Sequence, residues 1–221
     1  MKLRTKIASA AVVMTGLLAM TACGSKTDAG SPVAERAGQQ STSSSAPSSS
    51  AEKTVEVSVP DLPVTAAPVV AKTQGRVQVF SGPSDQPVEP TPDTGQGSSN
   101  LELVATNSDR IGTYLADGQG RTLYRFDKDS ATPPKATCNG DCAKTWPALL
   151  VESPGKIYPT GVDPQLVGYV ERADGTCQVT VAGWPVYYFA KDTEVGDIKG
   201  QGVGGTWFAV SPTGEKTKAV A

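Results

Sequence analysis

The same eight-residue pattern occurs twice in the C-terminal half of the chain, and this duplication limits what the chain can fold into. Residues 122–129 read TLYRFDKD and residues 185–192 read PVYYFAKD. In a strand, the aromatic pair of each copy lies on one face, because side chains alternate with a period of two. The shared pattern is Tyr-x-Phe-x-x-Asp, and its six positions are Tyr124, Phe126, Asp129, Tyr187, Phe189 and Asp192.

The similarity extends beyond this motif in both directions. Downstream, KTWPALLV contains Trp146 and GTWFAVSP contains Trp207; upstream, LADG at 115–118 matches RADG at 172–175. We therefore predict two repeat units, at about 110–152 and 166–213. A unit of this size cannot bury an apolar face alone, so we expect the two to pack about a pseudo-twofold axis.

Short apolar alternations separated by Gly-rich turns predict a mostly β fold. We expect a small, internally duplicated antiparallel β domain over 105–215, followed by a tail at 216–221. Only CAKTW at 142–146 indicates a helical turn. The expected strands are 112–117, 121–127, 147–152, 166–172, 177–183, 185–191 and 206–212.

The first residues are typical of a bacterial secretory signal. Three basic residues precede an apolar run from Ile7 to Met20 that ends in small residues. The sequence MTAC at 20–23 resembles a lipobox, which predicts a signal peptide at 1–22 and a lipid-modified, palmitate-bearing Cys23. The alternative is a plain secretory signal in which Cys23 is incidental. The lipobox places the protein on the extracytoplasmic face of the cell membrane.

Residues 23–104 are rich in Ser, Pro, Thr and Ala, and Phe80 is the only aromatic residue among the first hundred. Such a segment cannot offset its ordering entropy, so we expect a disordered stalk after the lipid anchor. Two patches, 55–60 and 76–80, alternate like strands. Flanking Pro residues make their pairing with the domain the less favoured interpretation.

Composition excludes several function classes. Histidine is absent, which rules out His metal or haem ligands, a Ser-His-Asp triad and a Cys-His nucleophile pair. The formal net charge is −2, and it becomes −5 when the three basic residues of the signal peptide are removed. The chain shows no basic patch, so we expect no nucleic-acid partner.

The repeated motif has two interpretations. In the first, the aromatic pairs form the core, and Asp129 and Asp192 accept backbone amides in the turns that follow. In the second, two aromatic-plus-carboxylate clusters line a ligand site. The first is favoured, because aromatic residues of a small β domain usually lie in its core.

The cysteines allow structural and chemical roles. Cys138 and Cys142 flank a tight Asn-Gly turn, and a disulfide is expected outside the cytoplasm. Cys177 is left over: it is buried and free, replaces one partner of the short bridge, or pairs between molecules. A redox or metal-handling site built on the three thiols is the alternative. We expect no metal and no cofactor.

Two further features bear on ligands. Acidic residues gather at 192–197 and 127–129, where we expect solvated loops rather than a Ca²⁺ site or the paired carboxylates of a hydrolase. Trp184 lies between Gly183 and Pro185 at a turn and is the best candidate for stacking on a sugar ring.

Several stretches together carry a family resemblance: LADGQGRTLYRFDKD, CNGDCAKTWPALL, RADGTCQVTVAGWPVYYFAKD and GQGVGGTWFAVSPTG. With the lipobox, residues 110–214 closely resemble bacterial secreted-repeat lipoproteins. The resemblance implies an envelope lipoprotein and supplies no catalytic residues; Cys177 departs from the family's pattern.

We therefore expect a lipid-anchored, non-enzymatic binding or structural module of the cell envelope. Its expected partners are the membrane, through the anchor, and a cell-wall polymer or small ligand. A redox or metal-handling protein using Cys138, Cys142 and Cys177 is the first alternative. A carboxylate-based hydrolase is the second.

Overall fold

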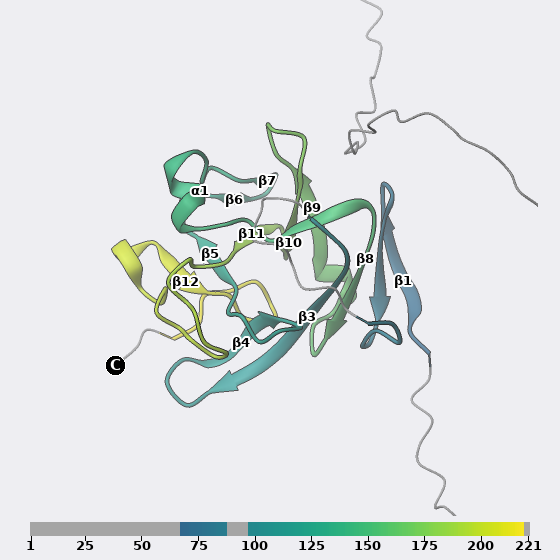
Figure 1. Ribbon diagram of the computed structural model, residues 1–221, viewed down its shortest axis with the longest axis horizontal. Helices are drawn as coiled ribbons and strands as arrows, with labels where there is room; N and C mark the ends of the chain where they lie inside the picture. The colour runs from purple at the N-terminus through teal and green to yellow at the C-terminus, as the bar shows by residue number, and fades with distance from the viewer. Residues whose placement is uncertain (1–66, 88–96, 219–221) are drawn as a thin grey trace, which may run out of the picture.

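The computed structural model describes residues 67–87 and 97–218, and it confirms a mostly β fold (Figure 1). The predicted signal peptide, Cys23 and the patch at 55–60 lie outside the described residues. The elements are, in chain order, β1 (Val69–Gln74), β2 (Val77–Ser81), β3 (Ser98–Ser108), β4 (Gly112–Asp117), β5 (Tyr124–Phe126), β6 (Ser130–Ala131), β7 (Pro134–Lys135), α1 (Asp141–Thr145), β8 (Leu150–Thr160), η1 (Pro164–Leu166), β9 (Val167–Glu171), β10 (Cys177–Val181), β11 (Trp184–Tyr187), η2 (Val203–Gly205) and β12 (Trp207–Ala209).

One sheet contains most of these strands. Its main path runs β1-β2-β8-β10-β11-β5-β12, while β3 pairs with β4 and β8, and β9 pairs with β10. In Figure 1, β1 lies on one side of the molecule and β12 on the other. The short strands β6 and β7 form a separate two-stranded sheet.

Two pairings correct the expectation of an entirely antiparallel domain. Both β2 and β3 run parallel to β8. Parallel neighbours need a long connection between them. Here β2 and β3 come from the N-terminal side of the first repeat, and the chain completes much of that repeat before it reaches β8.

The predicted stalk at 23–104 is wrong for residues 67–87 and 97–104. β1 and β2 form an antiparallel hairpin beside β8 (Figure 1), and β3 already begins at Ser98. Val77, Val79 and Leu101 are buried in the core. Short Val-rich strands need no aromatic residues of their own, because they cover an apolar core that the repeats help to supply.

The two repeats align differently from the sequence prediction. The turn after Asp117 joins β4 to β5 and leads directly into the motif, whereas the turn at Asp174 joins β9 to β10, one strand earlier. The structural counterparts are Gly112 and Gly175, each twelve residues before its motif tyrosine and each at a positive φ, 82° and 81°. Both turn positions therefore favour glycine, which adopts a positive φ without a steric penalty.

The buried residues form two clusters. One is largely aliphatic and lies among β2, β3, β8 and β10; the other is largely aromatic and joins the two repeats. The described part of the chain contains no helix suited to crossing a bilayer, since α1 has only five residues.

Val79 provides a test of whether residues 67–87 belong to the folded domain. Val79 is 0% exposed, whereas Val69 in the same hairpin is 64% exposed. We expect Val79→Ala to lower the free energy of unfolding by about 2 kcal/mol, because it removes two buried methyl groups. Val69→Ala should change it by less than about 0.5 kcal/mol. Urea unfolding checks both, and equal effects would contradict this role of the hairpin.

Candidate functional site

The two motif tyrosines reach across the molecule to each other's repeat. The Tyr124 hydroxyl donates to Asp192 Oδ2 over 2.5 Å, and the Tyr187 hydroxyl donates to Asp129 Oδ2 over 2.7 Å. Both rings are fully buried. The tyrosine of each motif therefore donates its hydrogen bond to the aspartate of the other motif, and not to the aspartate of its own.

The second oxygen of each carboxylate fixes the loop that follows it. Asp129 Oδ1 accepts from the Thr137 amide at 2.7 Å and from the Thr137 hydroxyl at 2.8 Å. Asp192 Oδ1 accepts from the Lys199 amide at 3.0 Å. The aspartates also begin equivalent turns, because their amides donate to the carbonyls of Phe126 and Phe189.

Four aromatic rings stack at the centre of this arrangement. Trp146 and Trp207 are parallel within 2°, with ring centroids 3.8 Å apart. Phe126 covers the outer face of Trp207 at 4.1 Å, and Phe189 covers that of Trp146 at 4.2 Å. Each phenylalanine thus stacks on the tryptophan of the other repeat.

The backbone crosses in the same way. Tyr124 in β5 pairs with Ala209 in β12, and Tyr187 in β11 pairs with Ala148, two residues after Trp146. The Trp segment of each repeat is therefore a strand neighbour of the other repeat's motif. We name the two motifs together with Trp146 and Trp207 the crossed cluster.

Burial sets the protonation of the crossed cluster. It raises the pKa of the Asp129 and Asp192 carboxyl groups above the ordinary range, and their hydrogen bonds oppose this only in part. Burial and the neighbouring carboxylates raise the pKa of both tyrosines, so their hydroxyls remain protonated donors.

Trp184, the predicted sugar-stacking residue, lies in β11 and is half-buried. The buried Arg125 guanidinium lies 3.4 Å from its ring centroid and donates to the Gly214 carbonyl at 2.9 Å. One face of the indole is therefore covered, and a sugar ring could stack only on the other. Sequence reasoning missed Arg125, which occupies the variable position between Tyr124 and Phe126.

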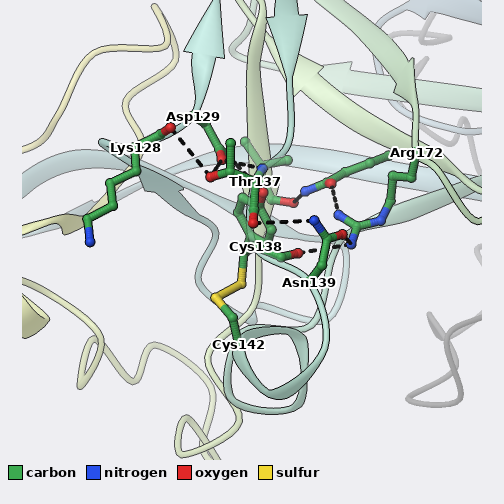
Figure 2. Close-up of a disulfide and its surroundings, with 10 residues drawn as sticks. Lys128, Asp129, Thr137, Cys138, Asn139, Cys142 and Arg172 are labelled. Atoms are coloured by element: carbon green, nitrogen blue, oxygen red, sulfur yellow. Dashed lines mark hydrogen bonds between the residues drawn. A yellow bond between two sulfur atoms is a disulfide. The ribbon is translucent and has the colours of Figure 1, made fainter.

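The predicted disulfide between Cys138 and Cys142 is confirmed, with Cα atoms 5.3 Å apart (Figure 2). Arg172, from the second repeat, donates to the Cys138 carbonyl at 2.9 Å and to Asn139 Oδ1 at 2.7 Å. This contact fixes the disulfide loop of the first repeat against the second. Sequence reasoning placed Arg172 only in the RADG match at 172–175, and nothing in that match points to the disulfide loop.

Cys177 takes no part in this bridge and is buried in β10, opposite Val151 of β8. The interpretations in which it replaces one partner of the short bridge or is a free thiol are therefore wrong. Within the described ranges, no three His, Cys, Asp or Glu side chains are grouped so as to hold a metal ion.

The acidic loop after Asp192 is organised by Asp197. Its Oδ2 accepts from the amides of Thr193 and Glu194 at 2.9 Å and from Lys199 Nζ at 2.6 Å. These contacts hold the pKa of Asp197 down, at about 2. The loop is thus a hydrogen-bonded turn in which the Lys199 ammonium group pairs with the Asp197 carboxylate.

The fold and the crossed cluster define a small β domain built from two interlocked repeats. A family described as a secreted repeat of unknown function matches the chain twice, at residues 105–150 and 168–211. The predicted resemblance to a secreted-repeat family is confirmed. Comparisons with curated proteins and with solved structures gave no match.

Removing either motif hydroxyl tests the crossed bonds. We expect Tyr124→Phe and Tyr187→Phe each to lower the free energy of unfolding by about 1.5–3 kcal/mol, because each leaves a partly buried carboxylate without its charged hydrogen bond. Tyr169→Phe is the matched control, since only the backbone of Tyr169 has hydrogen bonds among the described residues. Thermal and urea unfolding measure the differences. If the control loses as much stability as the motif variants, the crossed bonds are not stabilising.

The raised carboxyl pKa values predict a dependence on pH. In the window from about pH 4, the ordinary Asp value, up to the raised folded values, the folded state retains protons that the unfolded state has released. Stability from these two groups is therefore present at low pH and is lost as pH rises through the window. Replacing both Asp129 and Asp192 by Asn removes this loss.

We expect the unfolding free energy of the double Asn variant, relative to the wild type, to increase between about pH 4 and pH 7. Urea unfolding at both pH values measures this difference. A difference that is constant, or that decreases with pH, would show that the carboxyl pKa values are not raised by folding.

Proposed function

We propose that this protein is an envelope lipoprotein, anchored through Cys23, whose duplicated β domain is a non-enzymatic module that binds the cell wall. The secretory leader and the MTAC sequence at 20–23 support the anchor. The two matches to a secreted-repeat family support an extracytoplasmic location.

The observation that carries the non-enzymatic role is the use of every tyrosine and aspartate side-chain oxygen in the repeated motif. Both oxygens of Asp129 and both oxygens of Asp192 accept hydrogen bonds from the protein itself. A catalytic carboxylate must instead exchange a proton with a substrate within hydrogen-bond reach. The motif therefore serves to join the repeats.

The cysteine-based alternative finds less support. Cys138 and Cys142 are joined, Cys138 is buried against the aromatic cluster, and Arg172 fixes the loop between them. A dithiol that cycles between redox states needs access for a partner thiol. This loop has the features of a structural disulfide.

Acyl labelling tests the anchor. We expect the full chain, produced in a bacterial host with its own leader, to incorporate labelled palmitate and to fractionate with membranes. Cys23→Ser should lose the label and leave the membrane fraction, because acyl chains contribute roughly 0.8 kcal/mol per buried methylene. Ser25→Ala is the matched control and should behave like the wild type. Retention of Cys23→Ser in the membrane fraction would contradict the anchor.

The same Cys23→Ser protein tests the binding role. We expect it to sediment with purified cell-wall sacculi from a Gram-positive and a Gram-negative bacterium, or from one of them. Failure to sediment with either preparation would overturn the binding role, whatever the outcome for acylation.

A further inference from the structure

A second candidate site lies away from the crossed cluster, on the outer face of β2, β8 and β3. The surface there is hollowed by an open pocket of about 640 Å³, within the size range of small-molecule sites. All of its lining residues lie outside the stretches that match the repeat family. They are Pro68, Phe80, Asp85, Gln86, Pro87, Asn100, Lys156 and Tyr158.

Strand register explains why these side chains meet. Lys156 of β8 pairs with Gln78 of β2 and with Asn100 of β3, and paired residues of adjacent strands share a face. The next residues on that face of β2 and β8 are Phe80 and Tyr158. The residues between them, including Val79 and Ile157, point to the opposite face and are buried in the core.

An aromatic platform forms the floor of the pocket. The rings of Phe80 and Tyr158 stack with centroids 4.7 Å apart and an interplanar angle of 19°. Tyr158 is buried and thereby fixes the orientation of the half-buried Phe80 ring above it. The platform is therefore formed before any ligand arrives.

The Tyr158 hydroxyl distinguishes this pocket from the crossed cluster. Tyr158 is only 1% exposed and lines the pocket, yet its hydroxyl has no hydrogen bond to any residue of 67–87 or 97–218. The hydroxyl oxygen is not among the enclosed side-chain atoms without a partner, so it is open to the pocket, where a ligand can bond to it. The hydroxyls of Tyr124, Tyr187 and Tyr188 instead donate to aspartates.

Four more polar side chains surround the platform, three of them exposed and one, Asn100, half-buried. The side chains of Asp85, Gln86, Asn100 and Lys156 make no hydrogen bond or ion pair with another described residue. The turn that carries two of them is ordered, since Ser84 bonds to both the amide and the carbonyl of Gln86. The pocket is thus bordered by polar side chains that are open to solvent and available to a ligand.

We propose that this pocket binds a neutral saccharide segment of two or three rings. The C–H face of a sugar ring suits the Phe80 platform, while the amides, the carboxylate and the phenol suit hydroxyl and acetamido groups. The charges of Asp85 and Lys156 balance, which favours a neutral ligand. The inference rests on the proposed wall-binding function and assigns it a site and a ligand class.

Titration calorimetry with two trisaccharides tests the proposal. Chitotriose carries N-acetyl groups and cellotriose does not, so the pair separates aminosugar polymers from plain glucans. We expect the solubilised full-length protein to bind at least one of them with a Kd on the order of 0.1 mM. Phe80→Ala should weaken binding about tenfold, a loss of about 1.4 kcal/mol.

Two further variants keep the test decisive. Tyr158→Phe removes only the unpaired hydroxyl, so it should fold normally and weaken binding about fivefold. Phe208→Ala is the matched control: Phe208 is also a half-buried aromatic residue, but it lies in β12 outside the pocket. It should leave the Kd unchanged.

The proposal is overturned if neither trisaccharide binds the wild-type protein. It is also overturned if Phe80→Ala, Tyr158→Phe and Phe208→Ala all bind the tighter-binding trisaccharide with the same Kd. Sedimentation with sacculi separates this failure from failure of the proposed function. Wall binding that survives Phe80→Ala and Tyr158→Phe would leave the wall-binding module intact and place its ligand elsewhere. If the wild-type protein does not bind the cell wall, both the proposed wall-binding function and the proposed saccharide site are overturned.

Discussion

The exchange of hydrogen bonds between Tyr124 and Asp192, and between Tyr187 and Asp129, is the constraint on which the rest of the domain depends. Each bond needs a donor from one repeat and an acceptor from the other, and both lie in a largely buried aromatic environment. An unpaired carboxylate there would be costly. The ring stack and the strand pairings cross in the same sense, so the repeats reach their stable state only together.

The sequence was sufficient to predict the duplication, because Tyr-x-Phe-x-x-Asp and its Trp tail recur at almost constant spacing. It also predicted the disulfide, because an Asn-Gly turn brings Cys138 and Cys142 together. It could not predict the crossing. The sequence pattern suggests that a tyrosine and an aspartate five residues apart bond to each other within one motif. The pairing of β5 with β11 and β12 instead brings each tyrosine to the aspartate of the other motif.

The N-terminal strands were missed for a compositional reason. Residues 67–87 have one aromatic residue and several prolines, which is typical of a linker, but Val77 and Val79 are buried in β2, which pairs with β8. The saccharide pocket was missed with them. Its residues come from three separate stretches, near 80, 100 and 156, and they become neighbours only through two parallel pairings that no local pattern reveals.

The exchange also bears on how such a domain can change over time. A substitution at Asp192 removes the acceptor of Tyr124, in the other half of the sequence, and leaves the tyrosine of its own motif paired. Selection to restore the bond therefore acts between the two copies. Duplicated segments usually drift apart independently, but these two can diverge only as a matched pair. The same geometry would also let two separate single-repeat chains complete each other, which makes a homodimer of one repeat a physically sufficient ancestor of this domain.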